Sequence, residues 1–183
     1  MVVSCKKVLP DLRRFVNVNP GGMQWESDLI GYNTLNSYGS PSYYVQRMFN
    51  NYKGDEVIGI SAEGVPIQLQ KLNHKDSLAL VKPKAYPGLF YVATRNSKTG
   101  TVFLKIVNCL PTVQKVNLKL AGAIRVKTSG KVIIMKAESP EDTNTISEPQ
   151  KIIPVSSAFG GMRKDFNYSF TPYSITILQI ETR

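Results

Sequence analysis

Hydrophobic and polar residues follow two different patterns along this chain, and the pattern changes near Gly54. Before that residue, a short apolar run at Asp28–Asn33 leads into a turn. The segment that follows places four apolar side chains on one face of a helix, namely Tyr44, Val45, Met48 and Phe49. This order of patterns predicts a strand, a turn and an amphipathic helix.

The flanking residues predict where this helix begins and ends. Ser40 can cap the free backbone N–H groups of the first turn. Pro41 suits the first helical position because an N–H there would have no helical partner. Gly54 can adopt the left-handed conformation that ends many helices. We therefore expect a helix over Pro41–Tyr52 with Gly54 as its C-terminal cap.

After Gly54 the sequence is typical of an antiparallel β-protein. Short apolar and β-branched runs alternate with turn residues at a spacing of about ten residues. The segment RNSKTG at 95–100 has the composition of a hairpin turn, with Gly100 able to adopt positive φ. The expected strands are Glu56–Ser61, Pro66–Lys71, Leu89–Arg95, Thr101–Asn108, Val113–Leu120, Lys131–Ala137, Lys151–Val155, Phe166–Phe170 and Ser174–Glu181. The predicted fold class is mainly β: an antiparallel β-sandwich or jelly roll with one N-terminal α-helix.

The net charge of +10 at pH 7 raises the question of a nucleic-acid partner. Its distribution favours another explanation, since Lys115 and Lys119 face one way along an extended segment while Val116 and Leu118 face the other. This alternation is typical of the solvated face of a half-buried sheet. We therefore expect no nucleic-acid partner, and an attraction to acidic polysaccharides is the main alternative use of the charge.

Candidate chemistry is sparse. His74 is the only histidine, and Cys5 and Cys109 are the only cysteines, so we expect no hydrolytic triad, no metal site and no cofactor. The acidic residues are scattered, and Glu26 and Asp28 are more typical of a solvated strand entrance than of a catalytic pair. No apolar run reaches about 18 residues, so we expect no membrane partner. The sequence thus predicts no catalytic residue.

Several spaced motifs nevertheless resemble one enzyme family. They are FVNVN, DLIGYN and YGSPSYYVQRMF within 15–49, TGTVFLKIVN at 99–108, Asn144, Glu148-Pro149, IIPV at 152–155, and FTPYSITILQI at 170–180. Taken in this order, they resemble the end of the catalytic domain and the C-terminal domain of α-L-arabinofuranosidases of glycoside hydrolase family 51. The similarity covers roughly Phe15 to Thr182. Residues 1–14 do not resemble the family, and Thr145-Ile146 replaces its usual Ser-Phe.

The resemblance implies a division of the chain into two parts. Residues 1–53 would be the remnant of the last β/α unit of a barrel, although residues 1–14 within it would not be native to the family. Residues 54–183 would be the C-terminal β-sandwich. The apolar faces of the strand and helix would lack the barrel that normally covers them. They would cover the sandwich, pair with another chain as a homo-oligomer, or stay exposed.

The resemblance also implies a function for the intact protein. Such an enzyme hydrolyses terminal α-L-arabinofuranosyl residues of arabinose-containing polysaccharides with two glutamates, neither of which lies in the matched region. The chain alone should therefore be inactive, and its partner would be the missing catalytic barrel or parent chain. Asn17 and Trp25 would lie at the barrel rim and could contact substrate in an intact enzyme.

The sequence leaves the localisation and an alternative function open. The family's substrates suggest a secreted or periplasmic parent, whereas this chain carries no export signal of its own. The alternative function is that of a stand-alone carbohydrate-binding or structural β-sandwich, in which Tyr43 and Tyr44 would offer stacking surfaces for sugars.

Overall fold

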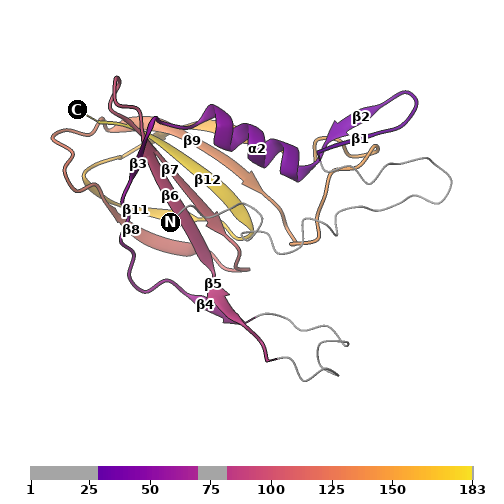
Figure 1. Ribbon diagram of the computed structural model, residues 1–183, viewed down its shortest axis with the longest axis horizontal. Helices are drawn as coiled ribbons and strands as arrows, with labels where there is room; N and C mark the ends of the chain where they lie inside the picture. The colour runs from indigo at the N-terminus through magenta and orange to yellow at the C-terminus, as the bar shows by residue number, and fades with distance from the viewer. Residues whose placement is uncertain (1–28, 70–81, 183) are drawn as a thin grey trace.

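An antiparallel six-stranded sheet forms the centre of the computed structural model, which describes residues 29–69 and 82–182. Its strand order is β10-β9-β12-β7-β6-β3, and Figure 1 shows the sheet with helix α2 along it. The bounds of these strands are β10 Val155–Gly160, β9 Ser129–Lys136, β12 Ser174–Glu181, β7 Thr101–Asn108, β6 Leu89–Arg95 and β3 Glu56–Ile58. Strands β8 (Gln114–Lys119) and β11 (Asp165–Phe170) pair as a separate two-stranded layer.

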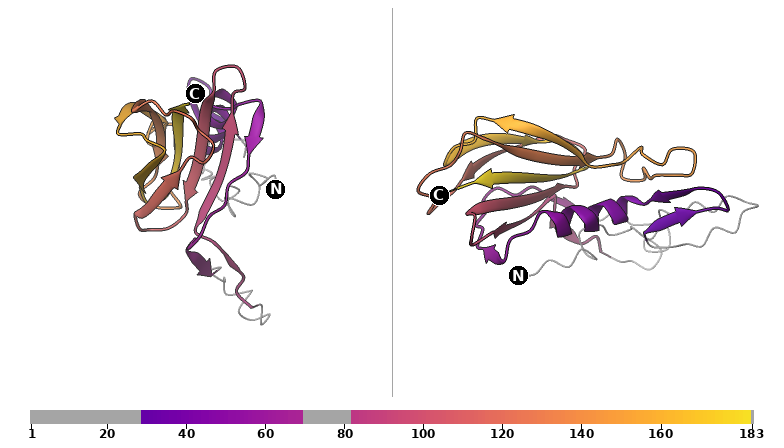
Figure 2. Two further views of the ribbon diagram at one scale, coloured as in Figure 1. Left: turned by 90° about the vertical axis from the view of Figure 1, so that its left-hand side faces the viewer. Right: turned by 90° about the horizontal axis from the view of Figure 1, so that it is seen from above.

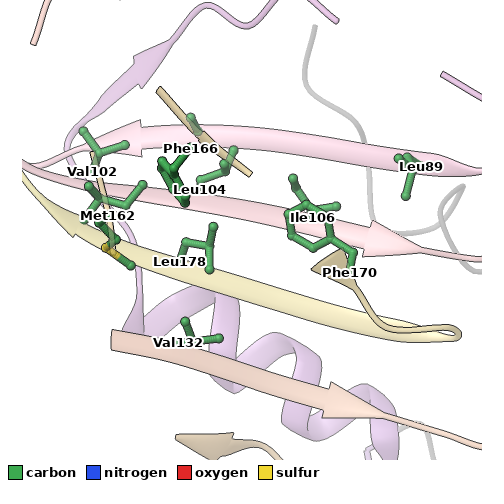
Figure 3. Close-up of a cluster of buried hydrophobic side chains, with 11 residues drawn as sticks. Leu89, Val102, Leu104, Ile106, Val132, Met162, Phe166, Phe170 and Leu178 are labelled. Atoms are coloured by element: carbon green, nitrogen blue, oxygen red, sulfur yellow. The ribbon is translucent and has the colours of Figure 1, made fainter. Parts of the chain in front are cut away.

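The main core lies between the six-stranded sheet and the β8–β11 pair. Alternate residues of the central strands point to this side, as in the facing pair Leu104 and Leu178 of β7 and β12. Figure 3 shows how Phe166 and Phe170 of β11 lie over these strands. The apolar residues of β8, among them Val116 and Leu118, are partly buried and pack against the same core cluster. The two-layer packing confirms the predicted antiparallel β-sandwich, whereas the jelly-roll variant is not confirmed.

Helix α2 (Pro41–Asn51) covers the opposite face of the six-stranded sheet. Its buried residues Val45 and Met48 pack against Ile133 of β9 and Ile177 of β12 in a second apolar cluster. The right-hand view of Figure 2 shows the helix lying alongside the sheet. The sequence left three possibilities for the apolar face of this helix: it could cover the sandwich, pair with another chain or stay exposed. In the structure it covers the sandwich.

Most predicted strands agree with the structure, and one is wrong. Three were predicted with the observed bounds, namely Leu89–Arg95, Thr101–Asn108 and Ser174–Glu181. Lys151–Val155 is not a strand, because the backbone N–H and C=O of Ile152 bind the side chain of Asn144 and not a neighbouring strand. Strand β10 begins at Val155 instead and was not predicted. The predicted strand Pro66–Lys71 is described only as β4, Ile67–Leu69, which pairs with β5, Ala85–Pro87.

The helix prediction is confirmed at its start and corrected at its end. The Ser40 hydroxyl accepts a hydrogen bond from Tyr43 N at 3.2 Å, and Pro41 occupies the first turn. The C-cap is Tyr52, and Gly54 does not adopt a left-handed conformation. A Cβ atom on Gly54 would lie 2.0 Å from the carbonyl oxygen of Arg95. Close approach of two backbones, and not helix termination, therefore requires glycine there.

Two hairpins extend from the body of the molecule. Strands β1 (Ile30–Tyr32) and β2 (Ser37–Gly39) form the hairpin before α2, at the right of Figure 1. The β4–β5 hairpin projects at the bottom of the same view. The apolar run expected at Asp28–Asn33 is thus a strand over Ile30–Tyr32, and Asp28 lies outside the described residues.

Candidate functional site

The two residues expected to contact substrate, Asn17 and Trp25, lie outside the described residues. Cys5, Glu26 and His74 also lie outside them, so the structure does not place these side chains. What it does place is the junction between α2 and the sandwich, the acidic residues of the sandwich, and the exposed apolar surface of the β1–β2 hairpin.

Two of the described acidic residues, Asp55 and Asp142, accept hydrogen bonds that lower their carboxyl pKa values. Asp55 accepts hydrogen bonds from the backbone N–H and the hydroxyl of Ser97, which lower its carboxyl pKa. Asp142 accepts from Ser139 N at 2.9 Å and from Lys151 Nζ at 3.0 Å, and these contacts lower its pKa too. A general acid needs its pKa raised toward neutral pH, so these two carboxyl groups are tuned in the opposite direction.

The described residues also offer no built metal or thiol site. Among the described segments 29–69 and 82–182, no three histidine, cysteine or acidic side chains lie together as metal ligands. Burial raises the pKa of the Cys109 thiol to about 11, so that it stays protonated and weakly nucleophilic at neutral pH. None of the described helices is both long enough and apolar enough to span a membrane.

Tyr43 and Tyr44 were the expected stacking surfaces of the alternative function. Both rings are half-buried and meet edge to face, with their centroids 5.2 Å apart. Tyr44 packs against the apolar cluster under the helix, and the ring of Tyr43 lies close to Gly39. Neither arrangement resembles an open, flat platform on which a sugar ring could stack.

Three polar residues of the family-like motifs are almost fully buried: Lys105, Asn108 and Asn144. The Asn108 amide donates to Thr112 O at 3.0 Å and to Thr171 O at 2.8 Å, and its oxygen accepts from Leu110 N. It therefore ties the β7–β8 connection to the β11–β12 corner. Sequence reasoning gave these residues no role, although the motif LKIVN and the isolated Asn144 had marked them.

Lys105 and Asn144 both contact α2 or its approach. Lys105 Nζ donates to Phe49 O at 3.2 Å and lies 4.9 Å from the centre of the Phe49 ring. Asn144 Nδ2 donates to Gly39 O at 2.8 Å, immediately before the helix cap. The junction between the helix and the sandwich thus contains buried polar contacts as well as an apolar cluster.

The β1–β2 hairpin carries an exposed apolar surface, which we call the hairpin patch and define as Ile30, Tyr32 and Leu35. Their exposed fractions are 46%, 48% and 89%. Ile30 and Tyr32 lie two positions apart on β1 and so share one face. A patch of this kind on a projecting element is typical of a surface that contacts another domain or chain.

Comparison with known proteins gives a consistent result. The family model described as the α-L-arabinofuranosidase C-terminal domain matches residues 15–174. The curated α-L-arabinofuranosidase 1 of Arabidopsis thaliana is 25% identical over 166 residues, which cover 88% of this chain and 21% of the plant protein. The chain therefore spans about a fifth of that relative's length.

Solved structures share the fold. An arabinose-bound family 51 α-L-arabinofuranosidase is similar with a TM-score of 0.66 at 23% identity, covering 87% of this chain and 22% of the other. The family 51 enzyme of Thermotoga petrophila is similar with a TM-score of 0.68 at 16% identity, covering 83% of this chain and 31% of that one. At these identities the likeness concerns the fold of the matched part.

Proposed function

Since the chain belongs to the family of α-L-arabinofuranosidase C-terminal domains, we propose that it serves as the accessory β-sandwich of a larger retaining α-L-arabinofuranosidase. The intact enzyme would release terminal α-L-arabinofuranosyl residues from arabinose-containing polysaccharides. The match of the family model to residues 15–174 is the observation that carries this proposal.

The chemistry of the described residues supports an accessory role and not a catalytic one. A retaining glycosidase needs two carboxyl groups about 5 Å apart, one of them able to hold a proton near neutral pH. Asp55 and Asp142 instead bind hydrogen-bond donors that lower their pKa values. The two catalytic glutamates would belong to a barrel elsewhere in the parent protein, and this chain alone would be inactive.

We propose the following division of the chain. Residues 54–183 form the C-terminal sandwich, and residues 1–53 include the last β/α unit of the barrel. The change from a helical to an alternating pattern near Gly54 supports this boundary. In the intact enzyme, Asn17 and Trp25 would precede this unit at the barrel rim and contact the sugar.

The catalytic barrel is the proposed partner of the hairpin patch. Ile30, Tyr32 and Leu35 are exposed in this chain, and burying them against a barrel would remove apolar surface from water. A homo-oligomer through α2 remains a prediction with less support, because Val45 and Met48 already pack against the sheet.

The genomic sequence upstream of Met1 tests the proposed function first. We expect a reading frame that encodes the rest of a barrel, including its two catalytic glutamates. The purified chain should release no arabinose from an aryl α-L-arabinofuranoside, whereas the chain joined to that barrel should. Release of one or more moles of arabinose per mole of the isolated chain would contradict the proposal.

Titration with polysaccharides distinguishes the alternative function. A stand-alone carbohydrate-binding module should bind arabinan or arabinoxylan without a barrel. The accessory role predicts no measurable heat for the isolated chain, because the described tyrosines of α2 are half-buried. Saturable binding to arabinan, together with no barrel upstream, would favour the stand-alone module.

A further inference from the structure

Buried polar side chains contact the last turn of helix α2 and the residue just before its N-terminal cap. At the C-terminal end, Lys105 of β7 is only 5% exposed, and its Nζ donates to Phe49 O at 3.2 Å. Phe49 lies in the last turn of the helix, where carbonyl groups lack helical partners. A cation there also meets the negative end of the helix dipole and the face of the Phe49 ring.

At the N-terminal end, Asn144 makes the corresponding contact. It is 1% exposed, and its Nδ2 donates to Gly39 O at 2.8 Å and to Ile152 O at 3.0 Å. Its Oδ1 accepts from Ile152 N at 2.7 Å. Gly39 directly precedes the helix cap Ser40, whose own N–H donates to Leu29 O at 2.8 Å, next to β1. The Asn144 contact therefore reaches both the helix start and the base of the hairpin.

These polar contacts do what the apolar cluster cannot do alone. Apolar burial is non-directional, so Val45 and Met48 could pack against Ile133 and Ile177 with the helix shifted along the sheet. A shifted helix would leave Lys105 and Asn144 buried without these partners, which is costly. Buried polar groups can in this way select one register among several that bury similar apolar area.

We propose that Lys105 and Asn144 form a two-point clamp that fixes the register of α2 on the sheet. By fixing the helix, the clamp also fixes the direction in which the β1–β2 hairpin leaves the sandwich. The two residues are positioning residues, because they act through the helix and contact no substrate. The clamp rests on contacts within this chain, and its significance for a barrel partner rests on the proposed function.

Hydrogen exchange measured by mass spectrometry tests the clamp in the full chain. Lys105→Met keeps the alkyl stem and removes the amino group. Asn144→Asp keeps an acceptor for Ile152 N and removes the Nδ2 donor to Gly39 O and Ile152 O. In either variant we expect amides in 41–51 to exchange about tenfold faster than in the unmodified chain, as a lost buried hydrogen bond implies. Exchange in β12 should change little.

Matched controls make the same chemical changes at exposed positions. Lys115→Met and Asn117→Asp lie on the solvated face of β8 and should leave exchange in 41–51 unchanged. The proposal is wrong if the clamp variants leave 41–51 protected, if β12 exchange rises equally, or if a variant unfolds altogether, since a clamp for one helix should leave the sheet folded. These outcomes do not depend on whether a barrel lies upstream, so failure of the proposed function would be seen separately.

Discussion

At the scale of single residues, the requirement for particular side chains comes from contacts between segments distant in sequence. Gly54 is a glycine because the carbonyl of Arg95 occupies the space of a Cβ atom. Asn144 is buried because it binds a carbonyl 105 positions earlier. The pattern of residues around Gly54 and Asn144 does not reveal their partners, Arg95 and Gly39. The sequence therefore predicted a helix cap at Gly54 and no role for Asn144.

Gly54→Ala should destabilise the protein. The added Cβ would lie 2.0 Å from a backbone oxygen that cannot rotate away, so the segment before β3 must move away from the end of β6. We expect the free energy of unfolding in urea to fall by about 1–3 kcal/mol. Gly59→Ala is the control, since no atom lies within 4 Å of its added Cβ, and its effect should be close to zero.

Thr176→Val should stabilise the protein. The Thr176 hydroxyl is buried in β12 and has no hydrogen-bond partner among the described residues, so replacing it with a methyl group removes a desolvation cost. We expect a gain of about 1 kcal/mol in the free energy of unfolding. Thr182→Val should have the opposite sign, because the Thr182 hydroxyl donates to Gly100 O at 2.6 Å. Equal signs for the two substitutions would contradict this explanation.

At the scale of elements, the sequence predicted best those strands that alternate cleanly or run apolar on both faces. The bounds of β6, β7 and β12 follow from their own residues, because these strands are central and bury alternate side chains on each side. Lys151–Val155 is also rich in apolar residues, but the side chain of Asn144 forms hydrogen bonds with the backbone N–H and C=O of Ile152. These groups are then not available to a neighbouring strand. The position of α2 on the sheet depends on contacts with Lys105 of β7 and Asn144 of the 137–154 connection. The periodicity of residues 41–51 could therefore predict a helix, but it could not predict where the helix lies on the sheet.

Asn108→Ala should weaken the corner between two strand pairs. Asn108 donates to three carbonyl groups, those of Thr112, Phe170 and Thr171, and truncation leaves them without this donor. We expect a loss of about 2–3 kcal/mol in the free energy of unfolding, measured with urea. Asn117→Ala on the exposed face of β8 should cost no more than about 0.5 kcal/mol. Comparable losses at the two positions would show that burial of the amide is not the cause.

At the scale of the whole molecule, a stable sandwich supports a projecting apolar hairpin. The sandwich and its helix could be predicted from the strand spacing and the amphipathic segment. The candidate substrate contacts, Asn17 and Trp25, could be named only through the resemblance, because their chemistry depends on a barrel that these residues would line. The proposed barrel would account for the exposed hairpin patch in the same way, because it would bury the patch in the intact enzyme.

We expect the isolated chain to self-associate through the hairpin patch, and Leu35→Asn should reduce this self-association without changing the stability of the fold. Leu35 is 89% exposed, so the substitution removes exposed apolar surface and leaves the packing of the core unchanged. Light scattering at increasing protein concentration should show a smaller rise than for the unmodified chain, and the free energy of unfolding should change by less than about 0.5 kcal/mol. Leu104→Asn, at a buried position of β7, should instead unfold the protein. Unchanged scattering would contradict self-association through the hairpin patch.

The position of β12 in the sheet has a consequence for how the protein is made. β12 lies between β7 and β9, and it pairs with both along most of its length. During translation, β6 and β7 can form a hairpin early, but β9 and β10 have no central neighbour until residues 174–181 leave the ribosome. The sheet therefore closes only after synthesis has reached its last described strand, and until then the nascent chain presents open strand edges that a chaperone would have to shield.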